Sequence, residues 1–169
     1  NSGMSEPATV DDLPLLERRR IEAMVLVPVI RAMQARFGEE AVNEVVGQAI
    51  RDLARRQGES RRGDREVRIP DVRRSLRSAG PLTEGSLTVT LHEGDDHHFG
   101  FDVTHCQFVD MYRELDAGDL GFLLSCNRDF AGFEGMAPDL EFSRTQTRMQ
   151  GAEFCDFRYR DPAGAPEAG

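Results

Sequence analysis

The chain has 169 residues, which is enough for one ordinary domain with a substantial hydrophobic core. Its 21 basic residues are all arginine, so mechanisms that need a lysine Schiff base, a P-loop lysine or a lysine general base are excluded. Residues 1–80 carry 15 Arg against 13 acidic residues, residues 81–169 carry 6 Arg against 17, and the net charge is −9. An acidic chain is a poor nucleic-acid binder, because phosphate contacts need a basic surface.

A local exception to the acidic balance is the segment 51–77, with ten Arg and five acidic residues. Such a segment can contact RNA, DNA or anionic lipid, but runs of like charge are more often a solvated helix face and loop, which is the interpretation we favour. Three cysteines, no signal peptide and no run of 18 apolar residues predict a cytoplasmic protein with reduced thiols and no membrane or nucleic-acid partner.

The N-terminal half has the apolar spacing of helices. This spacing predicts helices over three segments: 15–36, 39–57 and 70–78. A turn at Gly80-Pro81 is expected to end the third helix. The first two form a helical hairpin joined at Gly38, with Asp11 and Asp12 as the cap of the first helix and Pro28 as a kink or break within it. The polar, Arg-rich residues 58–68 are expected to form a mobile loop.

Beyond residue 82 the apolar period changes to two, which is typical of strands. Two hairpins are predicted, one turned at 94–96 and one at Gln150-Gly151; their strands span 86–91, 99–104, 140–149 and 152–160. Helices are predicted over 106–115 and 120–131. The order indicates an α+β fold: a four-stranded antiparallel sheet with helices packed on one face, preceded by the N-terminal helical hairpin.

One domain is therefore expected, in three parts. Residues 1–80 supply the helical hairpin and Arg-rich loop, residues 81–160 form the half that contains the pocket, and residues 161–169, rich in Pro, Gly and Ala, form a disordered tail.

Two cysteines lie on predicted helices beside groups that can move protons. Cys106 follows His105 where a strand becomes a helix, and a helix N-terminus favours a thiolate. Cys126 and Asp129 share one helix face, where the carboxylate can accept a proton or bind a substrate cation but also raises the thiol pKa. For each cysteine the alternative is a small residue buried in the core.

The third cysteine is placed by the register of the second hairpin. A two-residue turn at Gln150-Gly151 puts Arg144 and Gln146 on one sheet face with Cys155, while Asp156 points to the other face. Arg144 is then either a clamp for a substrate carboxylate or the partner of a structural acid such as Asp110 or Glu114.

A metal centre is the alternative to a metal-free thiol site. Cys106, Cys126 and Cys155, with His105 as a fourth ligand, have the chemistry of a tetrahedral zinc site. The cysteines are 20 and 29 residues apart and form no Cys-x2-Cys motif, so we predict a site without metal and keep zinc as the alternative cofactor.

Several motifs of the second half occur together in one known family. They are His105-Cys106, Leu120 to Asp129 with its Cys-x2-Asp element, the Arg-Thr-Gln-Thr run 144–147 and the Cys-Asp-Phe run 155–157. With these motifs the chain resembles the L-2-amino-thiazoline-4-carboxylic acid hydrolase family, most densely over 104–160. The resemblance implies hydrolytic opening of a five-membered cyclic amidine ring, in some members within a biosynthetic pathway.

The resemblance and the residues together suggest a substrate and roles. A small cyclic amidine or sulfur-containing amino acid with a carboxylate would place that carboxylate on Arg144 and its amidine nitrogen on Asp129 or Asp156, with Gln146 beside them. Cys106 or Cys126, with Cys155 nearby, would add to the amidine carbon, and His105 would carry the proton.

Two other functions stay open from the sequence. The same pocket without turnover would make a non-catalytic small-ligand or metal-sensing module. The other is a structural or scaffolding domain whose helical hairpin forms a homodimer through the apolar stripe of the second helix, although such stripes are more often core. The members of this stripe are Val42, Val45, Val46, Ala49, Ile50 and Leu53.

Overall fold

A computed structural model describes residues 9–78 and 85–164. The helices are α1 (Leu15–Phe37), α2 (Glu39–Arg62), α3 (Ile69–Ser78), α4 (Gln107–Glu114) and α5 (Arg128–Met136). The strands are β1 (Leu87–Leu91), β2 (His98–Cys106), β3 (Glu141–Ser143) and β4 (Cys155–Arg160). Short helical turns are η1 (Val10–Asp12), η3 (Phe122–Cys126), η4 (Arg148–Gln150) and η5 (Pro162–Gly164), of which η3 is a π-helical turn.

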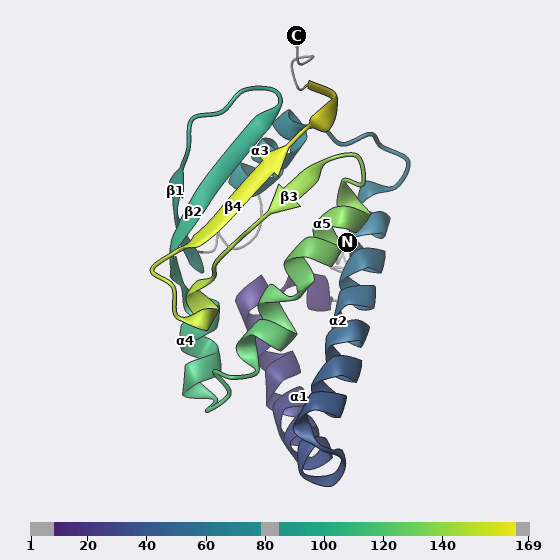
Figure 1. Cartoon of the computed structure of the whole chain (residues 1–169), viewed down its shortest axis with the longest axis vertical. Coiled ribbons are helices and arrows are strands. Elements are labelled where there is room, and N and C mark those ends of the chain that lie inside the picture. The colour runs from purple at the N-terminus through teal and green to yellow at the C-terminus, as the bar shows by residue number, and fades with distance from the viewer. Residues whose placement is uncertain (1–8, 79–84, 165–169) are drawn as a thin grey trace, which may run out of the picture.

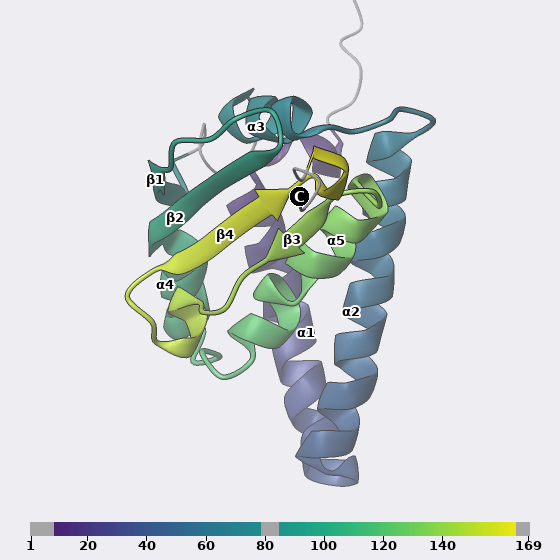
Figure 2. The same ribbon diagram turned by 45° about the horizontal axis from the view of Figure 1, so that its top comes forward.

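The sheet is antiparallel, with strand order β1-β2-β4-β3, and the α+β prediction is confirmed (Figure 1). One sheet face buries Phe99, Phe101 and Val103 of β2 against Ile69 of α3 and Phe133 of α5. A second cluster joins α1, α2, α4 and η3. Helices α1 and α2 lie side by side and extend beyond the sheet (Figure 2), so they form the predicted hairpin.

Helix α1 of the hairpin differs from the prediction at its N-terminal end. Pro14 occupies the N-cap position of α1, where Asp11 or Asp12 was expected. The Asp12 carboxylate accepts a hydrogen bond from the backbone N–H of Thr9. Helix α1 is continuous through Pro28. The turn expected at Gly80-Pro81 to end α3 lies outside the described residues.

Helix α2 includes residues 58–62, which were predicted to start a loop. Gly58 explains the difference, because a Cβ there would lie 2.2 Å from the carbonyl oxygen of Gly132 in α5. The glycine therefore allows close helix packing and does not break the helix. The Arg-rich segment is also tied into the fold, since Arg55 pairs with Glu134 at 2.8 Å.

The second predicted hairpin is only partly formed. Phe142 pairs with Tyr159 as the register predicts, but the ladder ends at Ser143. Beyond Ser143 the Asp156 carboxylate replaces the backbone partners of β4. It accepts hydrogen bonds from the backbone N–H groups of Thr145 and Gln146, both at 2.9 Å. Side-chain hydrogen bonds thus replace the strand ladder, and residues 144–147 belong to no strand.

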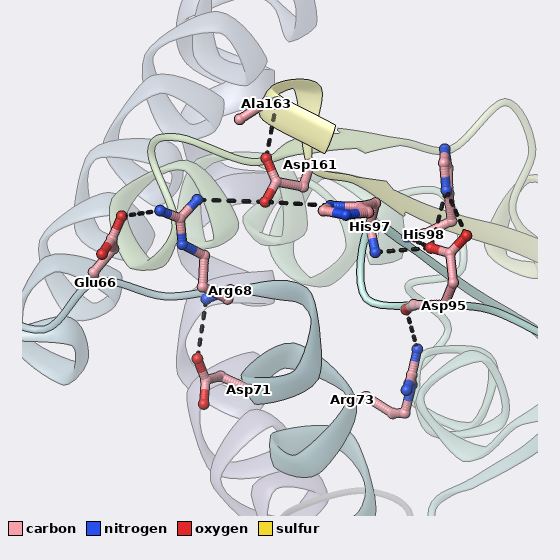
Figure 3. Close-up of polar contacts among 9 residues, drawn as sticks. All are labelled: Glu66, Arg68, Asp71, Arg73, Asp95, His97, His98, Asp161 and Ala163. Atoms are coloured by element: carbon pink, nitrogen blue, oxygen red, sulfur yellow. Dashed lines mark hydrogen bonds and ion pairs between the residues drawn. The ribbon is translucent and has the colours of Figure 1, made fainter. Parts of the chain in front are cut away.

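The C-terminal segment is anchored through Asp161, which is buried (Figure 3). Its carboxylate accepts a hydrogen bond from the Ala163 N–H at 2.9 Å and lies 3.4 Å from Arg68 Nη1 and 4.0 Å from His97 Nδ1. Residues 161–164, expected to belong to a disordered tail, are therefore fixed against the β1–β2 turn and the start of α3. Within the described ranges, no helix is long and apolar enough to cross a membrane.

Candidate functional site

A cavity of about 150 Å³ lies between the sheet, η3 and the start of α1, and all three cysteines line it. Each cysteine comes from a different element: Cys106 ends β2, Cys126 ends η3 and Cys155 begins β4. Asp129 and Arg144 line the same cavity. The volume is similar to that of cavities that hold benzene and is below that of drug-sized sites, so only a small ligand fits.

The π-helical turn η3 positions Cys126. Its wider turn is closed by the hydrogen bond from the Asn127 N–H to the Phe122 carbonyl at 2.9 Å. Asn127 is fixed in turn, because its side-chain amide donates to the Gly47 carbonyl of α2 at 3.0 Å. Gly121 precedes the turn, where a Cβ would lie 2.3 Å from the Met149 sulfur. The sequence pattern predicted a regular helix over 120–131 and missed the π turn, while helical structure continues to Met136.

Arg144 is held in place on several sides. Its Nη1 pairs with the Asp129 carboxylate and its Nη2 donates to the Cys126 carbonyl at 3.2 Å. Its guanidinium lies over the rings of Phe130 and Phe157, at 5.2 and 5.4 Å from their centroids. The Arg144 side chain is 2% exposed and that of Asp129 is 38% exposed, so the carboxylate is the more accessible member of the pair.

The partner of Arg144 differs from the acids considered from sequence. Asp110 instead lies 3.3 Å from His105 Nε2, and Glu114 pairs with Arg20 at 3.1 Å. Burial raises the pKa of Asp129 above the ordinary carboxyl range, although the Arg144 charge opposes the shift. The raised pKa makes the Asp129 carboxylate a stronger proton acceptor than an ordinary aspartate.

Burial raises the pKa of all three thiols. Cys106 occupies the N-cap of α4, where the N–H groups of Phe108 and Val109 partly offset burial, and Cys155 accepts a hydrogen bond from the Arg148 N–H at 3.1 Å. At Cys126, the negative charge of Asp129 adds to the effect of burial on the pKa. The thiolate expected at the α4 N-terminus is therefore not favoured in the free protein.

Alkylation should reveal this suppression of the thiolates. At about pH 7.5, iodoacetamide is expected to label the folded protein at least about 10-fold more slowly than free cysteine, because only the thiolate reacts. The rate should rise about tenfold per pH unit up to about pH 9, as expected for thiols with raised pKa values. Intact-mass measurements give the rates, with the urea-unfolded chain as the control. A thiol labelled at the rate of free cysteine would contradict this assignment.

A second cavity of about 260 Å³ adjoins the first and is rich in arginine. The two cavities share Leu15, Arg19, Arg128, Asp129 and Phe157.

Arg128 is the buried cation at the wall between the two cavities. Its Nε donates to the Leu124 carbonyl at 2.7 Å and its Nη2 donates to Glu22 at 2.9 Å. Its Nη1 is buried without a hydrogen-bond partner among the described residues. Arg19 lies beside it and shares Glu22 through a 2.9 Å ion pair. Neither arginine was identified from sequence, because nothing in the Arg-rich first helix or beside Cys126 distinguishes a buried arginine from a solvated one.

Three predicted site residues do not line the thiol cavity. The His105 side chain is 52% exposed and pairs with Asp110, because alternate residues of a strand point to opposite faces. Asp156 is occupied by the backbone of Thr145 and Gln146; burial raises its pKa, but these hydrogen bonds outweigh that effect and lower it. Gln146 donates to the Phe154 carbonyl at 3.1 Å. Gln146 and Asp156 therefore shape the chain between β3 and β4.

The zinc alternative gains no support from side-chain geometry. Over residues 9–78 and 85–164, no group of three or more His, Cys, Asp or Glu side chains is arranged to hold a metal ion. The three cysteines line the same cavity but do not form such a group.

Comparison with known proteins identifies the family. The model of the L-2-amino-thiazoline-4-carboxylic acid hydrolase family matches residues 18–159, and the chain belongs to that family. No curated protein matches the chain. Among solved structures, the phenol-responsive sensory domain of the transcription activator PoxR, crystallised with phenol, is similar at a TM-score of 0.43 and 10% identity. That match covers 84% of this chain and 75% of the other, and it carries no functional argument.

Proposed function

We propose that the protein is a hydrolase that opens a small cyclic amidine bearing a carboxylate, of the 2-aminothiazoline-carboxylate type. The observation that carries this proposal is the meeting of three thiols, an acid with a raised pKa and a fixed guanidinium in one small cavity. Membership of the hydrolase family supports the same reaction class.

The charges of the cavity suggest how such a substrate lies. A protonated amidine would face Asp129, the exposed member of the Asp129–Arg144 pair. The substrate carboxylate would then lie toward Arg128 and Arg19, the two other guanidinium side chains that line the cavity. The carboxylate role that the sequence suggested for Arg144 thus passes to Arg128, because Asp129 already neutralises Arg144.

Cys106 is the nucleophile that we propose. The bound amidinium would lower the thiol pKa in the complex, because a nearby positive charge favours the thiolate. The thiol proton passes to Asp129, and Sγ bonds to the amidine carbon. The ring C–N bond then breaks as Asp129 returns the proton to the leaving nitrogen. Water then adds to the same carbon and gives a proton to Asp129, which passes that proton to the leaving Cys106 sulfur. The amine freed by the ring opening takes up the proton of the new hydroxyl, so the carbonyl forms and Asp129 is ionised again. Cys126 is less suited to attack, since Asp129 raises its pKa further.

Turnover of L-2-amino-thiazoline-4-carboxylate, followed by mass spectrometry as the gain of one water, tests the proposal. Cys106→Ser is expected to lower kcat/KM by about 1,000-fold or more, since a serine hydroxyl at this site lacks a base strong enough to activate it. His105→Gln should keep wild-type turnover, because its side chain lies outside the cavity. Full turnover by Cys106→Ser would rule out the covalent mechanism.

A non-catalytic small-ligand module is the second candidate. It is favoured by the raised pKa of all three thiols, which leaves no thiolate ready in the free protein. In that case the same compound would raise the Tm of the wild-type protein without being consumed.

A further inference from the structure

Helix α1 is apolar on two opposite sides. One side buries Ala23 and Ile30 in the core. The other side carries large apolar side chains that are about half exposed or more: Ile21 53%, Met24 61%, Val25 63% and Val29 49%. Every exposed residue of α1 between Glu17 and Arg31 is apolar, with Pro28 completing the set. A continuous exposed apolar face of this kind marks an interaction surface.

The exposed apolar positions between residues 21 and 32 have a two-fold pattern. The positions 21, 24, 25, 28, 29 and 32 are symmetric about the point midway between residues 26 and 27. When two copies of α1 lie antiparallel about that point, the larger side chains meet smaller ones. The facing pairs are Ile21 with Ala32, Met24 with Val29, and Val25 with Pro28. Such self-complementarity is what an interface around a two-fold axis requires.

Charged residues at the two ends of this apolar face are related by the same two-fold symmetry. Glu17 and Arg36 are exposed and equally far from the midpoint. Neither forms an ion pair with another residue of 9–78 or 85–164; Arg36 only lies over the Phe37 ring, at 5.8 Å from its centroid. In the antiparallel pair, Glu17 of each copy faces Arg36 of the other, so both ends of the interface gain an opposite-charge contact.

We propose that the protein forms a two-fold homodimer through antiparallel α1 helices, with Val25 and Pro28 at the centre. The partner is a second copy, because the apolar positions and the end charges both complement themselves. Leu13 and Phe37, which are 39% and 66% exposed, lie at opposite ends of α1 and would come together at each end. The stripe of α2 considered from sequence is not this surface, since its Val42 and Ile50 are buried in the core.

Light scattering or sedimentation at about 20 μM tests the dimer, since association depends on concentration. The wild-type chain should be dimeric, and Val25→Glu should weaken the dimer by about 100-fold or more, because two unpartnered carboxylates would be buried at the axis. Val45→Glu is the matched control: Val45 is 64% exposed, but on α2, so this variant should remain dimeric. Circular dichroism confirms that each variant is folded.

A charge exchange tests the antiparallel register. Glu17→Arg and Arg36→Glu should each weaken the dimer, because each puts like charges at both ends. The double variant with both changes should recover wild-type association. A monomeric wild-type protein, an intact Val25→Glu dimer, or a double variant as weak as the single ones would each overturn the proposal. A wild-type monomer whose face binds another protein would overturn it as well.

Discussion

Replacing Arg144 by Met is expected to lower the free energy of unfolding by about 2–4 kcal/mol at about pH 8, because Asp129 loses its cation inside the protein. The Arg144 side chain is 2% exposed, so water cannot replace the lost guanidinium as a partner of Asp129 on that side of the pair. The Asp129 side chain is 38% exposed, which keeps the cost below that of a fully buried charge.

The loss should depend on pH in one direction. Without the guanidinium, burial raises the pKa of Asp129 further than in the wild-type protein. The folded variant then holds its proton to higher pH than the folded wild-type protein, so its stability relative to wild type falls as pH rises above the raised pKa of Asp129 in the wild-type protein. The fall ends once pH passes the raised pKa of the folded variant. Below about pH 4, Asp129 is neutral in both states, and the charge penalty disappears.

Urea unfolding at several pH values measures this dependence. The double variant Arg144→Met with Asp129→Asn should regain much of the lost stability, and it should lose the added pH dependence, because it has no carboxyl to titrate at this site. Arg31→Met is the matched control: Arg31 pairs with Asp119 at 2.6 Å, but both side chains are largely exposed, and a loss of no more than about 1 kcal/mol is expected. Equal losses for Arg31→Met and Arg144→Met would contradict the buried pair.

Gly135→Ala should lower the free energy of unfolding by about 3 kcal/mol or more, at the upper end of the cost of overpacking. A Cβ at Gly135 would lie 2.2 Å from the Arg55 carbonyl oxygen and 3.1 Å from the Glu59 nitrogen. Both atoms belong to the backbone of α2, so no side-chain rotation relieves the clash. The two helices must separate, and the core between them loses contacts.

Gly132→Ala, three residues earlier in α5, is the matched control. A Cβ there would meet the Ala54 carbonyl oxygen at 3.7 Å, which is ordinary contact. Since alanine favours a helix over glycine by about 1 kcal/mol, this variant should be neutral or slightly more stable. Thermal unfolding by circular dichroism separates the two, with Tm for Gly135→Ala expected to fall by roughly 10 °C. Similar Tm values for both variants would exclude close helix packing at Gly135.

Periodicity in the sequence predicted the helical hairpin, the first strand pair and the α+β class, because each of those elements buries one regular face. It also grouped the three cysteines with Asp129 and Arg144, which the structure brings to one cavity. That grouping came partly from the family motifs, and the catalytic roles within it stay predictions.

The structure differs from the prediction where one residue contacts another segment of the chain. Gly58 has the local signature of a helix break, yet its missing Cβ serves a contact with α5 that no local pattern reveals. Asp156 replaces a strand ladder by side-chain hydrogen bonds, so the alternation that predicted a long hairpin ends at Ser143. Arg128 is buried by α1, which is far away in sequence, and its partner Glu22 could not be paired with it in advance.

The π-helical turn η3 also determines how many residues the chain needs at this point. Each residue of an α-helix rotates the backbone by about 100° about the helix axis. A turn with one extra residue therefore changes the rotation of the segment before it relative to the segment after it. Helix α5 is held by its glycine contacts with α2 and cannot rotate. Removing one residue from 122–126 would therefore turn the preceding segment about its axis and direct a different set of side chains at the sheet. We therefore expect a deletion within this turn to disrupt the packing of the segment that precedes it against the sheet.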